Sequence, residues 1–241
     1  MTVETIVANI TGNPKEDDKI YDKAGEILRA GGLVAFPTET VYGLGADALD
    51  VKASAKIYAA KGRPSDNPLI VHIADMDALY KLSSEVPKTA LKLAEKFWPG
   101  PITMILKKSD IVPDSITGGL GTVAIRMPSH KVAAELIRKS GVYIAAPSAN
   151  TSGKPSPTLA SHVIKDLSGK IDMIIADDTV DIGVESTIID LSEEVPAILR
   201  PGYITKEMFE EVIGRVTIDP AITDGVKAGV VPRAPGLSLI H

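Results

Sequence analysis

A proline-bounded loop at residues 61–68 carries side chains that could bind an anion. It reads KGRPSDNP and contains Lys61, Arg63 and Asn67 directly before an apolar run. A guanidinium and an amide on a stiff loop can grip an anionic, hydrogen-bonding ligand. For Lys61 alone, neutralisation of a helix C-terminus is the simpler interpretation.

Two polar side chains stand within or at the end of apolar runs. His72 lies within LIVHI, and Arg126 follows VAI. A histidine in such a run is more often a hydrogen-bonded core residue than a catalyst. A buried guanidinium without a partner is very costly, so Arg126 needs a carboxylate, either from the protein or from a ligand. Both sources stay open at this point.

Small hydroxyl and amide side chains are concentrated in the segment APSANTSGKPSPT, which follows another apolar run. Its simplest interpretation is a Ser/Pro turn, although loops at strand ends often carry function. Four cations stand beside loops or strand ends of this acidic chain: Arg63, Arg126, Lys154 and Arg200. Their placement favours a polyanionic small ligand such as a nucleotide.

Residues 43–48 fit the dinucleotide-binding pattern G-x-G-x-x-A. That pattern should directly follow a strand and open a helix, whereas here six residues separate the preceding strand from Gly43. We therefore expect residues 37–45 to form a glycine-rich loop rather than a dinucleotide site. No phosphate-binding G-x-x-x-x-G-K-[ST] loop occurs in the sequence.

The elements that must position these residues alternate between short β-rich runs and helical patterns. We expect strands at residues 33–36, 69–73, 102–106, 122–125, 143–146, 173–176, 186–191 and 197–199. We expect helices at residues 20–28, 50–61, 88–97, 131–139, 158–167 and 205–213. This order predicts an α/β or α+β fold with a twisted, mixed β-sheet.

The composition is that of an ordinary globular protein, with 44% hydrophobic and 24% charged residues and a net charge of −5. With no cysteine, the chain has no thiolate metal site, disulfide or cysteine nucleophile. It has neither a long apolar stretch nor a signal-peptide pattern, so we expect a cytoplasmic protein without a membrane contact. We expect a catalytic domain at residues 1–215 and a linker-like arm at residues 216–241.

Seven segments together resemble the YrdC family of threonylcarbamoyl-adenylate synthases, in the family's order. They are PTETVYGLG, KGRPSDNPLIVHI, WPGPITMIL, TVAIRMP, APSANTSGKPSPT, GVESTIID and ILRPG. The resemblance implies one α/β domain with a twisted mixed sheet, surrounding helices and a large basic cavity. It also implies that L-threonine, bicarbonate and ATP yield threonylcarbamoyl-AMP and pyrophosphate, with Mg²⁺ on the phosphates. A separate transferase then modifies adenosine 37 of tRNA, and whether this chain also binds tRNA directly stays open.

The resemblance assigns roles to individual side chains. Those implied to bind threonine are Thr40, His72, Arg126, Ser186 and the backbone at Ala146. Those implied to bind ATP are Arg63, Asn67, Thr122, Ser148, Ser156 and Arg200. Lys61, Arg63, Ser148 and Asn150 match the family's K-x-R and S-x-N pairs and are expected to be catalytic, with no residue expected to be a dedicated metal ligand.

Longer members of the family continue through a linker into a second small domain. The sequence VVPRAPG resembles the start of that linker, but five residues later the sequence ends, so we expect the second domain to be absent. One alternative function is a non-catalytic module that binds structured RNA, although the net negative charge disfavours it. A carbamoyl-adenylate domain of hydrogenase maturation proteins is a second, and it would carry zinc-finger cysteines.

Overall fold

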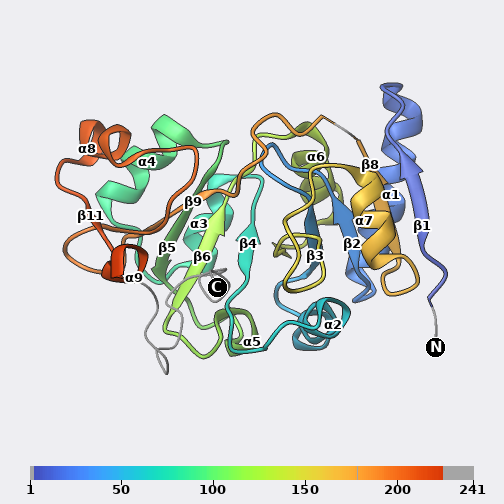
Figure 1. Cartoon of the computed structure of the whole chain (residues 1–241), viewed down its shortest axis with the longest axis horizontal. Coiled ribbons are helices and arrows are strands. Elements are labelled where there is room, and N and C mark those ends of the chain that lie inside the picture. Colours follow the sequence, from blue (N-terminus) through green and yellow to red (C-terminus); the bar gives the residue numbers. More distant parts are fainter. Residues whose placement is uncertain (1–2, 178, 225–241) are drawn as a thin grey trace.

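One mixed β-sheet runs through the whole molecule in a computed structural model that describes residues 3–177 and 179–224 (Figure 1). Its strands are β1 (Ile6–Asn9), β2 (Val34–Phe36), β3 (Gly43–Asp47), β4 (Ile70–His72), β5 (Ile102–Lys107), β6 (Thr122–Arg126), β7 (Ile144–Ala145), β8 (Met173–Ala176), β9 (Thr187–Asp190), β10 (Ala197–Arg200) and β11 (Thr217–Ile218). They lie in the order β1-β8-β2-β3-β7-β4-β6-β5-β9-β10-β11. Parallel and antiparallel neighbours alternate irregularly, which confirms the predicted mixed α/β architecture.

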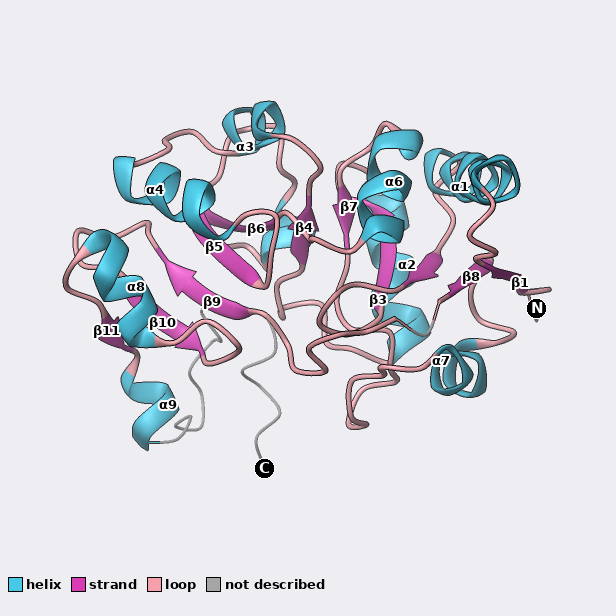
Figure 2. Ribbon diagram, turned by 90° about the horizontal axis from the view of Figure 1, so that it is seen from above, coloured by secondary structure: helices cyan, strands magenta, loops and turns pink. Residues whose placement is uncertain are grey.

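Helices cover both faces of the sheet (Figure 2). They are α1 (Pro14–Arg29), α2 (Val51–Lys61), α3 (Met76–Leu82), α4 (Lys88–Phe97), α5 (Asp114–Thr117), α6 (Lys131–Ser140), α7 (Ala160–Leu167), α8 (Lys206–Ile213) and α9 (Pro220–Asp224). Among the described helices, none combines the length and the apolar character that crossing a bilayer requires.

Strands buried on both faces explain the unbroken apolar runs of the sequence. In β2, Val34 and Phe36 belong to a cluster with α1 and α6, whereas Ala35 belongs to the cluster that includes α2 and α7. This alternation follows from the two-residue period of a strand. A third, smaller cluster contains Ile70 of β4 and Ala124 of β6.

The glycine-rich segment at residues 43–48 is a strand for most of its length, so the expectation of a loop through residue 45 was wrong. Gly43–Asp47 forms β3 and pairs with β2 and β7. A Cβ atom on Gly45 would lie 2.7 Å from Ile144 and 2.8 Å from Phe36, so the glycine is needed for packing within the sheet. The match to a dinucleotide-binding pattern is therefore a coincidence of packing.

The end of the described chain adds an edge to the sheet. Thr217 and Ile218 form β11 beside β10, and α9 follows. Residues 225–241, which make up most of the expected arm, lie outside the described residues.

Candidate active site

The end of α2 fixes the backbone of the predicted anion-binding loop. Asp50 caps the N-terminus of the helix, and Gly62 ends it in a left-handed conformation with φ of 62°. The backbone N–H of Arg63 then donates to the carbonyl of Tyr58 at 3.0 Å. This arrangement is the Schellman ending for which a glycine is suited, and it sets the direction in which the loop leaves the helix.

The loop itself holds the Arg63 guanidinium in a defined direction. Nη2 of Arg63 donates to Oδ1 of Asn67 and to the carbonyl of Pro68. Burial lowers the pKa of Arg63, and the nearby Arg200 lowers it further. An arginine held in this way is preorganised for an anion, because little conformational freedom remains to be lost on binding.

Lys61 points toward the Ser/Asn segment that the sequence singled out. Its buried Nζ donates to the carbonyls of Ser148 and Asn150, both at 2.5 Å, and to Oδ1 of Asn150 at 3.3 Å. Ser148 Oγ donates to the same Oδ1 at 2.6 Å. Burial lowers the pKa of Lys61 to about 7, and the positive charge of Arg63 acts in the same direction. The four residues expected to be catalytic are thus close to one another, with Lys61 bound to the loop that carries Ser148.

The strand ends bring His72 and Arg126 side by side. These two residues are paired in register in the parallel strands β4 and β6, and Arg126 is also paired with Thr103 of β5. His72 Nδ1 lies 3.2 Å from the carbonyl of Ile70. Burial lowers the pKa of His72 to about 3, and the adjacent Arg126 lowers it further, so the imidazole is neutral.

The carboxylate that Arg126 requires comes from the protein. Oε1 of Glu39, in the loop after β2, lies 2.7 Å from Nη2 of Arg126, and both side chains are at most 5% exposed. The two groups are poorly aligned for a hydrogen bond: neither oxygen of Glu39, nor Nε or Nη2 of Arg126, has a hydrogen-bond partner among the described residues. A guanidinium has five N–H donors in all, and Arg126 also lines the pocket described below, so it can bind a second acceptor beside Glu39.

Ser186 and Arg200 form a second cluster at the start of β9 and the end of β10. Arg200 Nε and Nη2 donate to the carbonyl of Ser186 at 3.1 and 3.0 Å. Ser186 Oγ lies 2.7 Å from Oγ1 of Thr103. Nη1 of Arg200 lies 2.8 Å from Oε2 of Glu185, whose Oε1 accepts a hydrogen bond from Ser156 at 2.8 Å.

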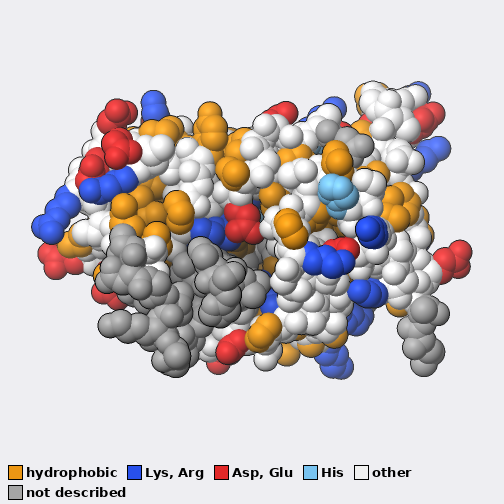
Figure 3. Space-filling view, viewed as in Figure 1, with side chains coloured by type: hydrophobic (Ala, Val, Ile, Leu, Met, Phe, Trp, Pro, Cys, Tyr) orange, Lys and Arg blue, Asp and Glu red, His pale blue; other side chains and the backbone are white. Residues whose placement is uncertain are grey.

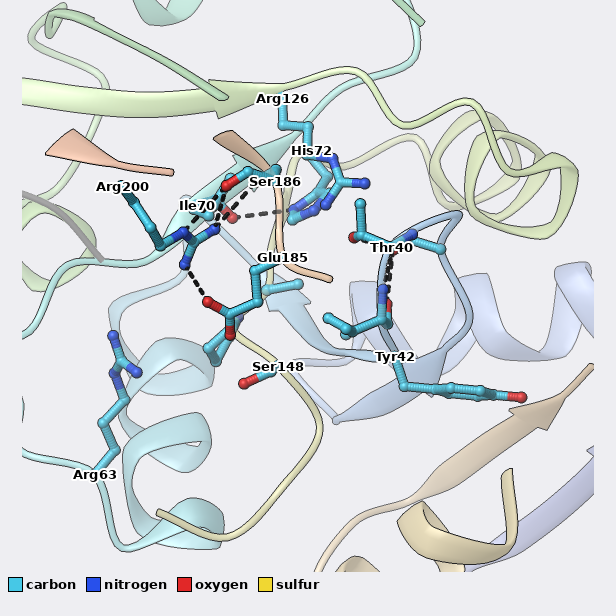
Figure 4. Close-up of a pocket in the computed structure, with 15 residues that line it drawn as sticks. Thr40, Tyr42, Arg63, Ile70, His72, Arg126, Ser148, Glu185, Ser186 and Arg200 are labelled. Carbon is cyan, nitrogen blue, oxygen red and sulfur yellow. Dashed lines mark hydrogen bonds and ion pairs between the residues drawn. The ribbon is translucent and has the colours of Figure 1, made fainter. Parts of the chain in front are cut away.

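One pocket joins these groups (Figure 4). Eight of the residues expected to bind substrates line it: Thr40, Arg63, His72, Arg126, Ala146, Ser148, Ser186 and Arg200. Lys61, Asn67, Asn150 and Ser156 lie behind it, each in contact with a lining residue. Thr122, at the start of β6, does not line this pocket.

Two acidic residues of this region were not predicted as site residues. Glu39 and Glu185 lie in the segments PTETVYGLG and GVESTIID, which carry part of the family resemblance. The signal for Glu39 was available, because a buried Arg126 needs a carboxylate and Glu39 is the only acidic residue between positions 27 and 46. The sequence held no comparable signal for Glu185, whose role depends on the distance between β9 and β10.

The match that decides the family covers most of the chain. A family model with the description Telomere recombination, which groups Sua5, YciO and YrdC proteins, matches residues 26–202. The chain belongs to the Sua5/YciO/YrdC family. The family predicted from the seven sequence segments is thereby confirmed.

Two curated members of the family are similar over nearly the whole chain. The threonylcarbamoyl-AMP synthase of Pyrococcus abyssi is 54% identical over 237 residues, which are 98% of this chain and 68% of that protein. The threonylcarbamoyl-AMP synthase of Bacillus subtilis is 50% identical over 234 residues, 97% of this chain and 67% of that protein. About one third of each relative lies outside the similarity.

A solved structure of the family has the same fold. The crystal structure of P. abyssi Sua5 complexed with L-threonine matches with a TM-score of 0.90 and 52% identity, over 97% of this chain and 67% of that one. The sheet and helices described above therefore have the same arrangement as in P. abyssi Sua5.

Both acidic and basic side chains lie on the face of the molecule shown in Figure 3, where several Lys and Arg side chains gather below the histidine on the right. Nucleic-acid-binding proteins usually gather Lys and Arg on one face, and the sequence as a whole has 31 acidic against 26 basic residues. The net negative charge of the sequence therefore favours a small-molecule site over an RNA-binding surface that depends on overall positive charge.

Proposed function

We propose that this chain is a threonylcarbamoyl-AMP synthase, and therefore a nucleotidyltransferase. L-Threonine and bicarbonate give N-carboxy-threonine, whose carbamate attacks the α-phosphorus of ATP and releases pyrophosphate. One observation carries the proposal: side chains expected to bind threonine and side chains expected to bind ATP line a single pocket. The names of the relatives and the threonine complex of P. abyssi Sua5 support it.

The Arg126 end of the pocket suits the amino acid. Arg126 lines this end of the pocket, and its guanidinium has five N–H donors, so a threonine carboxylate can accept from it in addition to the pairing with Glu39. The carbonyls of Ile70 and Ile144 both lie near the ring of His72, whose neutral form has one N–H donor and one acceptor nitrogen. Such a ring can hydrogen-bond to the threonine hydroxyl, which both donates and accepts.

The Arg63 and Arg200 end suits the phosphates. Displacement at phosphorus requires alignment and neutralisation of charge more than a strong base. Two guanidiniums, the Ser148 hydroxyl and the Lys61 ammonium behind it provide hydrogen-bond donors and positive charge. The carbamate is already an anionic nucleophile, so the pocket needs no Ser–His–Asp arrangement.

In this proposal, Mg²⁺ is bound by the phosphates of ATP and enters the pocket together with them. Among the described residues, no group of three or more His, Asp or Glu side chains is arranged to hold a metal ion. Glu185 is the only carboxylate among the lining residues, and it is engaged by Arg200 and Ser156. These residues fit an ion carried by substrate phosphates and do not form a protein-built cage.

The product determines the next step. A carbamoyl-adenylate is an activated mixed anhydride, so a transferase must accept the threonylcarbamoyl group, and we propose that it acts on adenosine 37 of tRNA in the cytoplasm.

Labelled bicarbonate tests the reaction. Purified protein is incubated with ATP, Mg²⁺, L-threonine and ¹³C-bicarbonate, and the adenylate is followed by mass spectrometry. We expect a threonylcarbamoyl-AMP that carries the label, with pyrophosphate in equal amount. Salt-sensitive binding of tRNA with no threonine-dependent adenylate would contradict the proposal and favour an RNA-binding module.

A further inference from the structure

Glu185 extends into the middle of the pocket, between Arg200 and Ser148 (Figure 4). Its Oε2 lies 2.8 Å from Nη1 of Arg200, and its Oε1 accepts the Ser156 hydrogen bond at 2.8 Å. Arg200 and Ser156 are two of the groups that should hold ATP. The carboxylate therefore occupies donors that the substrate needs.

Further positive charges face the same carboxylate. Burial lowers the pKa values of Lys61, Arg63 and Arg200, and the negative charge of Glu185 partly offsets this effect for each of them. Glu185 thus stands where an anionic ligand of these cations would be expected. Carboxylate and phosphate oxygens are alternative acceptors for the same guanidinium.

The backbone of Glu185 is held while its side chain is accessible. A Cβ atom on Gly202 would lie 2.6 Å from the carbonyl oxygen of Glu185, so the chain after β10 packs directly against this residue. The Glu185 side chain itself is 35% exposed. A carboxylate on a fixed backbone with a partly exposed side chain can leave its partners and return to them.

We propose that Glu185 is an internal competitor of the substrate phosphates, an inference that rests on the proposed function. Its carboxylate accepts from Arg200 and Ser156, and a bound phosphate group displaces it. Displacing Glu185 then weakens the binding of every phosphate ligand by the same free energy. ATP retains useful affinity because its nucleoside makes additional contacts, whereas pyrophosphate has none and leaves the pocket readily.

Calorimetric titration of inorganic pyrophosphate, in EDTA, compares the wild-type protein with Glu185→Gln and Glu185→Ala. Both variants should bind pyrophosphate about tenfold more tightly, the effect of one charged contact that no longer competes. ATP should gain affinity by a similar factor. Glu85→Gln is the matched control: Glu85 also pairs with a cation, Lys107, but far from the pocket, and its substitution should leave both affinities unchanged.

The outcomes separate this inference from the proposed function. Equal or weaker pyrophosphate binding by the Glu185 variants, with ATP still bound, would overturn the inference alone, and weaker binding would mean that Glu185 positions Arg200. Failure of wild type and variants to bind either ATP or pyrophosphate would overturn both. Unfolding curves and L-threonine binding show whether the variants retain the native pocket.

Discussion

Glu39 and Arg126 form a buried ion pair at the wall of the pocket, with 2.7 Å between Oε1 and Nη2. Arg126 also lines the pocket, so one guanidinium both forms a buried ion pair and is placed to bind a substrate. Glu39 balances the charge of the guanidinium, and the five N–H donors of Arg126 exceed what one carboxylate can accept.

Glu39→Gln should strongly destabilise the protein. It leaves a buried guanidinium without its carboxylate, for which the typical cost is about 3–5 kcal/mol of unfolding free energy. Denaturant unfolding measures the change. Glu135→Gln is the control, because Glu135 pairs with Arg138 on the surface and its removal should have little effect. Equal stability of the two variants would refute a structural role for the buried pair.

ATP binding should weaken as the pH rises through about 7. Burial lowers the pKa of Lys61 to about 7, so the side chain is charged below this pH and neutral above it. Its positive charge favours an anionic ligand, and only the ammonium form has three N–H groups for its three acceptor oxygens.

Titrations between pH 6.5 and 9 test this dependence. Lys61→Met should bind ATP more weakly than wild type at pH 6.5, and the difference should shrink as the pH rises. The ionisation of ATP itself is common to both proteins and cancels in the comparison. A constant difference across this range would show that Lys61 does not titrate there.

Arg63→Ala should lower kcat/KM for ATP about 10- to 100-fold, corresponding to the loss of about 1.5–3 kcal/mol of charged hydrogen bonding. The structure holds this guanidinium at the pocket wall through Asn67 and Pro68. Steady-state kinetics at varied ATP measure the effect, and Arg138→Ala on the exposed face of α6 is the control. A wild-type value of kcat/KM in Arg63→Ala would contradict the assignment of Arg63 to the ATP site.

Gly202→Ala should destabilise the protein and disturb the pocket. The added Cβ would lie 2.6 Å from both the carbonyl oxygen of Glu185 and the backbone N of Thr187, atoms that cannot move without shifting β9. Overpacking of this kind typically costs about 1–3 kcal/mol. Gly121→Ala introduces the same methyl group where no atom lies within 4 Å, so its thermal unfolding should match wild type. Equal midpoints for both variants would contradict the close approach.

Strong local signals made several elements predictable. The Asp50 side chain caps the start of α2, and Gly62 ends the helix in a left-handed conformation, as both residue types predict. The patterns at residues 88–97 and 173–176 correspond to α4 and β8. The strand β1 was missed because most of its residues are exposed and it depends on pairing with β8. The sequence predicts a loop where β3 lies because glycine is rare in strands. In the structure, the close packing of Phe36 and Ile144 requires a glycine at position 45.

The candidate site was predictable in its residue types but not in its pairings. The apolar surroundings of Arg126 showed that it needed a carboxylate, but nothing local could decide between a ligand and Glu39. Glu185 and Arg200 are 15 positions apart and meet only because β9 and β10 are antiparallel neighbours with a register shift. Contacts of this kind depend on the packed sheet rather than on local sequence.

A crystal structure of this chain with L-threonine and a non-hydrolysable ATP analogue tests the central claim most directly. We predict the threonine carboxylate at Arg126, the phosphates at Arg63 and Arg200, and the amino group facing the α-phosphorus across the same pocket. Either ligand bound outside this pocket, or a threonine amino group turned away from the nucleotide, would contradict the account.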